Sequence, residues 1–205
     1  GPGDIEDYYQ LEEQYDTFVG GFVWEWCDHG IYMGTTNDGR KKFYYGGDSG
    51  EYPHDGNFCM DGLVYPDRRP STGLKEYKNV HRPVRVHLVD AASGTYILQN
   101  NLDFTNLKDE LYLTYEILQN GVAVASGEIR DTGILDVSPR SKKTVQLPIK
   151  PLTDGACSVI ISSHQLHEKP FTPADFKLGF DQILLNENCT DTLTALLDAE
   201  KAAAD

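Results

Sequence analysis

Acidic and aromatic side chains gather in one part of the sequence, between residues 24 and 61. They are Trp24, Glu25, Asp28, His29, Asp48, Glu51, His54, Asp55, Phe58 and Asp61. Aromatic rings pack on the C–H faces of sugars and carboxylates bind sugar hydroxyls, so this combination favours a carbohydrate site. A glycosidase requires two carboxylates about 5 to 10 Å apart. Spacing along the chain leaves open whether any pair meets that requirement or each is a solvated loop charge.

The most apolar run of the chain leads into this region and contains both tryptophans, Trp24 and Trp26. Its alternation of Phe and Val predicts a strand over Phe18–Trp26 that is buried on both faces. Successive side chains of a strand point to opposite faces, so the two tryptophans lie on one face and Glu25 on the other. A core strand with two packing tryptophans is the plainer interpretation of this run.

Helices are predicted on both sides of the apolar run. Asp4 is expected to cap a helix over Ile5–Asp16, and a second helix is expected to start at Ser71 or Thr72 and run to Asn79 before Pro83. The apolar face predicted for the first helix consists of Tyr8, Leu11, Tyr15 and Phe18. A helix that leads into a buried strand is typical of α/β structure.

The segment from Asp28 to Arg69 is predicted to be a long irregular loop. Asn37-Asp38-Gly39 is turn chemistry between two short extended runs and indicates a hairpin within the loop. Loops of this length are usually functional or disordered. The aromatic residues of this loop argue against disorder, since disordered segments lack groups worth burying.

The second half of the chain changes to an apolar pattern of period two. Asn120-Gly121 between two alternating runs is a strong hairpin signal. The predicted strands are Val84–Val89, Thr95–Asn101, Leu111–Ile117, Val122–Ala125, Thr144–Ile149, Ala156–Gln165 and Asp175–Leu185. About seven short strands over roughly 100 residues predict an antiparallel sandwich of immunoglobulin type across residues 84–187. Thr190–Asp205 is expected to be an exposed helical linker, within a third segment at 188–205.

His164 and His167 lie near Ser162 and Ser163 on one predicted strand. Histidine and serine on a strand face solvent far more often than they form a catalytic triad, so no catalytic role is assigned to them.

The net charge of −14 over 205 residues argues against nucleic acid or an anionic membrane as a partner. No apolar run approaches the roughly 20 residues of a membrane span. The four cysteines are far apart, which favours reduced thiols and a cytoplasmic location. The opening Gly1-Pro2-Gly3 reads as the middle of a loop, so we expect a segment of a longer chain.

Four motifs occur in order in the first 83 residues and closely resemble the large bacterial β-galactosidases of glycoside hydrolase family 2. They are Gly-Gly-Phe-Val-Trp-Glu-Trp-Cys-Asp (20–28), Tyr-Gly-Gly-Asp (45–48), Asn-Phe-Cys-Met-Asp-Gly-Leu-Val (57–64) and Asp-Arg-Arg-Pro (67–70). The resemblance is weaker over the sandwich, where it is carried by residues 125–128 and 179–182. It implies a mostly β chain: the C-terminal α/β remnant of a (β/α)8 barrel at 1–83, then the immunoglobulin-like antiparallel β-sandwich. Phe18–Trp26 would be the eighth barrel strand, which puts Trp24 at the active-site end of the barrel.

The resemblance also implies roles for three residues. Trp24 is similar to the tryptophan that lines the galactose pocket, and Phe58 to the residue whose backbone carbonyl binds a sodium ion. Asp61 stands where many members have an asparagine ligand, so it is expected to bind the ion or a galactose hydroxyl directly. The magnesium ligands of the family would lie outside this chain.

The family's catalytic nucleophile lies in a Glu-Tyr-x-His-x-Met-Gly-Asn stretch that this sequence lacks. Glu25 and Asp28 are therefore not assigned as catalytic. The first hypothesis is that the chain is part of a retaining β-galactosidase, acting on galactosides such as lactose within a homo-oligomeric parent, and is inactive alone. The alternatives are a stand-alone galactoside-binding module and a purely structural sandwich whose unpaired barrel remnant associates with itself or is disordered.

Overall fold

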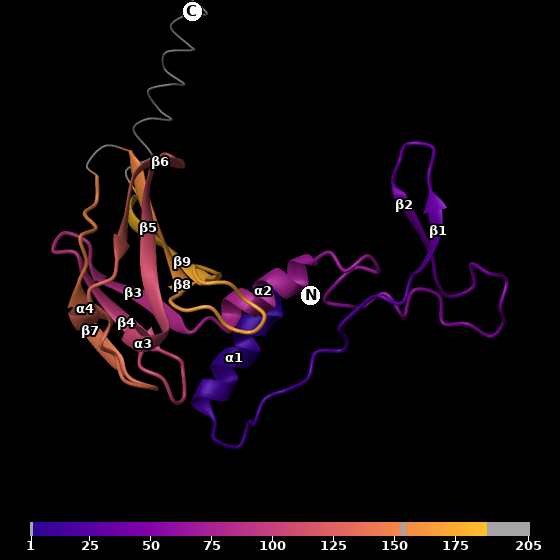
Figure 1. Ribbon diagram of the computed structural model, residues 1–205, viewed down its shortest axis with the longest axis horizontal. Helices are drawn as coiled ribbons and strands as arrows, with labels where there is room; N and C mark the ends of the chain where they lie inside the picture. The colour runs from indigo at the N-terminus through magenta and orange to yellow at the C-terminus, as the bar shows by residue number, and fades with distance from the viewer. Residues whose placement is uncertain (1, 153–154, 188–205) are drawn as a thin grey trace, which may run out of the picture. The chain divides into compact units, whose positions relative to one another are not determined.

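The computed structural model describes residues 2–152 and 155–187 of the chain. The helix expected at Thr190–Asp205 and the fourth cysteine, Cys189, lie outside the described residues. The chain divides into two compact units, residues 1–81 and 82–205 (Figure 1).

The first unit contains two helices and a hairpin. The short η1 helix (Pro2–Asp4) leads into α1 (Ile5–Gln14), and α2 (Thr72–Val80) ends the unit. Ser71 caps α2 as predicted, because its hydroxyl oxygen accepts a 3.3 Å hydrogen bond from the Leu74 amide.

Helix α1 differs from the prediction in length, cap and buried face. It ends at Gln14 rather than Asp16, and the side chain of Asp4 makes no capping hydrogen bond. The predicted apolar face is largely exposed, with Tyr8 at 60% and Tyr15 at 51%, whereas Tyr9 is buried. Tyr9 packs edge-on against the His81 ring at 5.8 Å between centroids. The buried face of α1 is therefore the face that carries Tyr9 and contacts His81.

The strand predicted over Phe18–Trp26 is wrong, because the structure assigns no strand to this segment. Its apolar side chains are exposed: 95% for Val19, 103% for Phe22, 77% for Trp24 and 61% for Trp26. A strand requires neighbours that pair with its backbone N–H and C=O groups. In the described part of the first unit no strand pairs with residues 18–24, and the Phe18 amide donates to the nearby Tyr15 carbonyl instead. The apolar segment therefore does not become part of a sheet.

The hairpin predicted in the long loop is confirmed. Strands β1 (Ile31–Thr35) and β2 (Lys41–Tyr44) pair antiparallel around the Asn37-Asp38-Gly39 turn. Gly39 has φ of +83°, which glycine adopts without steric cost. The Thr36 amide bonds the Arg40 carbonyl at 2.8 Å and closes the turn.

The second unit is a sandwich of two antiparallel sheets, which confirms the predicted mostly β fold (Figure 1). Its strands are β3 (Val84–Asp90), β4 (Thr95–Asn100), β5 (Leu111–Gln119), β6 (Val122–Ile129), β7 (Lys142–Gln146), β8 (Ala156–Gln165) and β9 (Lys177–Glu187). One sheet has the order β3-β4-β7 and the other the order β6-β5-β8-β9. The β5–β6 hairpin turns at Asn120-Gly121, where both residues have positive φ, as the sequence predicts.

The core of the sandwich lies between the two sheets. Tyr96 and Leu98 of β4 are fully buried, as are Leu113 of β5 and Val159 of β8. The alternation that predicted these strands therefore directs one face of each sheet inward. An ion pair also links the layers near their edge: Arg82 lies 2.5 Å from Asp181 of β9, whose other oxygen accepts from the Val86 amide of β3.

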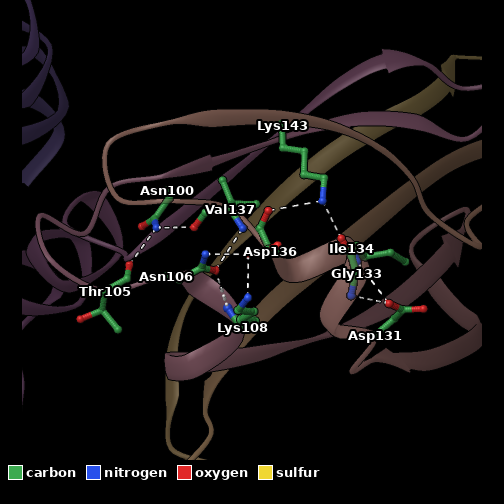
Figure 2. A network of polar contacts seen from close by, with 10 residues as sticks. All are labelled: Asn100, Thr105, Asn106, Lys108, Asp131, Gly133, Ile134, Asp136, Val137 and Lys143. Carbon is green, nitrogen blue, oxygen red and sulfur yellow. Dashed lines mark hydrogen bonds and ion pairs between the residues drawn. The ribbon is translucent and has the colours of Figure 1, made fainter.

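Two four-residue helices, α3 (Leu107–Glu110) and α4 (Thr132–Leu135), connect strands of the sandwich and were not predicted. Figure 2 shows the polar network that holds them. Asn106 caps α3 and also accepts from the Val137 amide at 3.1 Å, while Asp131 caps α4 through the Gly133 amide. Helices this short depend on such side-chain caps, because they make few backbone bonds of their own.

Within residues 2–152 and 155–187, no helix has the length and apolar character needed to span a membrane.

Candidate functional site

The candidate site is a junction between two segments of the first unit, residues 24–29 and residues 59–64. Backbone hydrogen bonds join them along their length. The bonds run from Glu25 N to Asp61 O (3.3 Å), Leu63 N to Glu25 O (2.8 Å), Val64 N to Trp26 O (2.9 Å), Asp28 N to Val64 O (3.0 Å) and His29 N to Cys59 O (2.9 Å). These bonds give the Trp24–His29 segment the backbone partners that it does not find in a regular sheet.

The peptide unit between Asp61 and Gly62 is bound at both ends within this junction. Its carbonyl accepts from the Glu25 amide at 3.3 Å, and its N–H donates to Oδ1 of Asp28 at 2.8 Å. The Glu25 amide belongs to the cis peptide bond that follows Trp24. Trp24 and Asp61, which are far apart in the sequence, are thus connected through one pair of hydrogen-bonded peptides.

Gly62 permits the close approach of the two segments. A Cβ atom added there would lie 2.2 Å from the backbone nitrogen of Asp28 and 2.4 Å from the carbonyl carbon of Cys27. Such distances are far inside van der Waals contact, and backbone atoms cannot turn away as a flexible side chain can. A residue other than glycine would therefore push the segments apart.

The side chains at the junction combine an aromatic surface with acidic groups. The Trp24 indole is 77% exposed and Asp61 is exposed, so both are accessible to a ligand. Glu25 pairs with Nε2 of His29 at 3.2 Å, and 20% of its side chain is exposed. Among the carboxylates around Trp24, Asp61 is thus the one that is open, whereas Glu25 and Asp28 have partners within the protein.

The two residues expected to bind sodium, Phe58 and Asp61, are both exposed. Phe58 is 80% exposed and precedes Asp61 by three residues. A backbone carbonyl and a carboxylate are oxygen donors of the kind that hard cations prefer, so the donor chemistry fits part of a sodium site. No cluster of three or more His, Cys, Asp or Glu side chains suited to a metal occurs among the described residues. Any ion here would need further oxygen ligands from water or from other groups.

A cavity of about 640 Å³ lies between strand β2 of the hairpin and residues 65–69, and the sequence did not predict it. Asp67 forms its polar centre, with Lys41 Nζ at 3.1 Å and Arg69 Nε at 2.8 Å from the same carboxylate oxygen. The hydrogen bond from Arg69, supported by that from Lys41, lowers the pKa of Asp67 to about 2. The Asp-Arg-Arg-Pro motif contains two of these residues, but no sequence signal joins them to Lys41.

The histidine and serine residues of β8 do not form a catalytic triad. Nε2 of His164 lies 3.1 Å from the Thr114 hydroxyl, and its Nδ1 lies 3.1 Å from the backbone carbonyl of Asp175. The Tyr112 ring stacks on His164 and its hydroxyl donates to the Asp175 carboxylate at 2.9 Å. These contacts hold the segment that leads into β9 against β5 and β8. The expectation that these side chains face solvent is wrong for Ser162 and Ser163, which are 6% and 2% exposed because β8 is a central strand of its sheet, and it holds for the exposed His167.

Two family models match the chain, one for each unit. The model described as "Glycosyl hydrolases family 2, TIM barrel domain" matches residues 1–86, and that described as "Beta-galactosidase, domain 4" matches residues 96–186.

Similar proteins are found among curated β-galactosidases. The chain is 43% identical over 189 residues to one from Actinobacillus pleuropneumoniae, an alignment that covers 91% of this chain and 17% of that protein. It is 39% identical over 183 residues to one from Staphylococcus xylosus, covering 89% of this chain and 18% of that protein. A third, from Arthrobacter sp. (strain B7), is 43% identical over 134 residues, or 65% of this chain and 13% of the relative. The chain thus spans less than a fifth of the length of these relatives.

The order of the two matched models agrees with the order of the two units, a helix-containing unit followed by a sandwich. The chain therefore belongs to the β-galactosidases of glycoside hydrolase family 2, in which it corresponds to the C-terminal part of the TIM-barrel domain followed by domain 4.

Proposed function

We propose that this chain is part of a retaining β-galactosidase that hydrolyses terminal β-D-galactosides such as lactose, and that it supplies one wall of the galactose pocket. The observation that carries the proposal is the exposed Trp24 indole, joined through hydrogen-bonded peptides to the exposed Asp61. An indole face can pack on the apolar face of galactose while a carboxylate accepts hydrogen bonds from its hydroxyls.

In a retaining glycosidase, one carboxylic acid protonates the glycosidic oxygen and a carboxylate forms the covalent glycosyl intermediate. Neither role is given to this chain. Glu25 is paired with His29 and Asp28 accepts from the Gly62 amide, so both are already engaged in holding the junction. The chain's own part in the reaction is to bind and orient the galactosyl group, and it is expected to be inactive alone.

Sodium is proposed as an additional ligand at Phe58 and Asp61. When bound, it would supply a positive charge that attracts an oxygen of the sugar. The support for this proposal is the type of the two donors, one carbonyl and one carboxylate, and the exposure of both residues.

The claim of inactivity is tested with the purified 205-residue chain and a nitrophenyl β-galactoside. We expect no release of nitrophenol above the rate in buffer. Measurable hydrolysis that survives repeated purification would contradict the claim.

The pocket role is tested in a hybrid enzyme, in which this chain replaces the segment of the A. pleuropneumoniae β-galactosidase that aligns with it. Trp24→Ala is expected to raise the KM of the hybrid about tenfold, which corresponds to a binding loss of about 1.4 kcal/mol. Phe171→Ala is the matched control, because it removes a 99% exposed ring from the sandwich and should leave KM unchanged. An unchanged KM in the Trp24 variant would refute the role of this residue.

A stand-alone galactoside-binding module is the second candidate function. The observation that favours it is that Trp24 and Asp61 are accessible in this chain without any other part of a pocket. Calorimetry of the chain against galactose and lactose decides the question, and the absence of heat at millimolar sugar would exclude the module.

A further inference from the structure

We propose that Asp28 is a positioning residue: its carboxylate fixes the Asp61–Gly62 peptide and thereby the direction in which Asp61 faces a galactoside packed on Trp24. The inference rests on the proposed function, since it concerns the same pocket. It assigns Asp28 no contact with the substrate.

The geometry of the peptide unit is the first support. The two bonds that hold it are unequal: the bond from Glu25 to the carbonyl is 3.3 Å long, at the weak end of the range, whereas the bond from Gly62 to the Asp28 carboxylate is 2.8 Å. A hydrogen bond to an ionised acceptor is also roughly twice as strong as a neutral one. The Asp28 carboxylate therefore does more than the Glu25 amide to set the orientation of this peptide.

The anchoring of Asp28 itself is the second support. Its amide donates to the carbonyl of Val64 at 3.0 Å, and the amide of the next residue, His29, donates to the carbonyl of Cys59 at 2.9 Å. The backbone of Asp28 is therefore bound on both sides of its side chain. A short carboxylate on an anchored backbone has little freedom, so it holds the Gly62 amide at a defined place.

The missing side chain of Gly62 is the third support. The space that a Cβ would occupy is filled by the backbone of Cys27 and Asp28. The two segments are close enough for the carboxylate of Asp28 to accept directly from the Gly62 amide. The backbone bonds of the junction are present whatever the side chains are, whereas the bond from Gly62 is lost when the Asp28 carboxylate is removed.

The experiment compares Asp28→Ala and Asp28→Asn in the hybrid β-galactosidase. Asp28→Ala removes the acceptor, and we expect it to raise both the KM for a nitrophenyl galactoside and the inhibition constant of free galactose about tenfold. Asp28→Asn keeps an oxygen that accepts from the Gly62 amide, so it should return both constants to within about threefold of the parent value.

The control variant is Asp131→Ala. Asp131 also accepts hydrogen bonds from backbone amides, Gly133 at 2.6 Å and Ile134 at 3.2 Å, but it caps α4 in the sandwich. It should lower the thermal midpoint and leave both constants unchanged. A purely structural role of Asp28 predicts this same pattern for Asp28→Ala, so that result would overturn the proposal. So would a failure of Asp28→Asn to restore binding.

The proposal and the proposed function fail in distinguishable ways. If Trp24→Ala leaves KM unchanged, the pocket role is wrong. If Trp24→Ala raises KM and Asp28→Ala does not, the pocket role stands and the positioning role is wrong.

A second measurement on the 205-residue chain does not depend on catalysis. The amide proton of Gly62 is expected at low field in the NMR spectrum, because it donates to a carboxylate, and to move upfield in Asp28→Asn while the Leu63 amide proton stays in place. Identical Gly62 shifts in the two proteins would overturn the proposal even if the hybrid variants were inactive.

Discussion

Asp67 shows how a residue in an irregular loop can be firmly held. Its side chain is only 7% exposed and contacts both Lys41 and Arg69. The two cations stabilise the ionised form and lower the pKa of Asp67 from 3.8 to about 2. Because the pKa in the folded protein is the lower one, Asp67 contributes stability above about pH 4, and the contribution is lost as the pH falls toward 2.

Asp67→Asn is therefore expected to lower the thermal midpoint of the first unit at pH 7. The difference from the parent chain should shrink as the pH falls from about 4 to about 2, because the carboxylate is then protonated in the unfolded chain and increasingly protonated in the folded one. Asp103→Asn serves as the control, since Asp103 pairs with Arg140 at an exposed position and should change the midpoint little. A difference that persists unchanged at pH 2 would contradict the ion-pair explanation.

Tyr96 is the opposite case, because it carries a buried polar group that no hydrogen bond from the described residues satisfies. The residue is fully buried on β4, and its hydroxyl has no hydrogen-bond partner in the described part of the chain. Burial raises the pKa of Tyr96 to about 12. Leaving a hydroxyl buried without a partner costs free energy that a phenyl ring would avoid.

Tyr96→Phe is expected to leave the stability of the sandwich unchanged or to raise it by about 1 kcal/mol. Denaturant unfolding followed by circular dichroism measures the difference. Tyr112→Phe is the contrasting variant, because the hydroxyl of Tyr112 donates to Asp175, and it should destabilise the sandwich. Destabilisation by Tyr96→Phe of the same size as by Tyr112→Phe would reveal a partner for the Tyr96 hydroxyl.

Among the elements, the loop between β4 and α3 depends on one buried amide. Asn100 is 1% exposed, and its Nδ2 donates to the carbonyls of Thr105 and Val137 (Figure 2). Its Oδ1 accepts from the Leu102 amide. This one side chain satisfies three backbone groups that have no strand neighbour there.

Asn100→Ala is expected to cost about 2–4 kcal/mol of sandwich stability, because it removes the side-chain partner of the Thr105 carbonyl and the Leu102 amide and leaves the Val137 carbonyl with the Leu107 amide alone. Asn100→Asp should be at least as damaging at neutral pH, since an oxygen would then face two carbonyl oxygens. Asn37→Ala, in the exposed hairpin turn, is the control and should cost far less. Equal losses from Asn100→Ala and Asn37→Ala in denaturant unfolding would contradict this role.

The sequence predicted those elements whose partners are near in the chain or whose pattern is regular. Asn120-Gly121 marks the β5–β6 turn, and the alternation from Ala156 to Gln165 marks β8 with both ends correct. The apolar run at residues 18–26 has the same kind of pattern, but a strand also depends on partners that local pattern does not reveal. The four-residue helices α3 and α4 were not predicted, because each depends on a single capping residue, Asn106 or Asp131.

The sequence predicted which residues belong to the candidate site but not the hydrogen bonds that connect them. Trp24 and Asp61 were singled out by type and by resemblance. Their connection was not, because it runs through the Asp61–Gly62 peptide and the Asp28 carboxylate, which accepts from an amide 34 positions away in the sequence. The sequence around Gly62 does not indicate this close contact, since Gly62 is not a turn glycine with positive φ.

For the whole chain, the two units differ in how completely they bury their apolar residues. The sandwich has a continuous core drawn from both sheets. The first unit exposes Val19, Phe22, Trp24 and Trp26 within one segment of eight residues. Adjacent exposed apolar side chains favour association, while the net charge of −14 opposes it.

We therefore expect the 205-residue chain to associate with itself at high ionic strength and to remain dispersed at low ionic strength, as salt screens the repulsion. Replacing Val19 and Phe22 together with Ser should reduce the association, measured by analytical ultracentrifugation. Phe171→Ser, which removes a single exposed ring from the sandwich, should not. A chain that stays monomeric at every salt concentration would contradict the expectation.

The close contact at Gly62 has a practical consequence for anyone who wishes to alter sugar selectivity by exchanging loops between relatives. Because Gly62 fits against Cys27 and Asp28 with no space for a further atom, a transplanted 59–64 segment would have to match the host's 24–29 segment. Residues 24–29 and 59–64 would therefore have to be exchanged together, even though a hairpin and a long loop separate them in the sequence. Libraries that randomise one stretch while keeping the other would consist mainly of sequences that cannot close the junction.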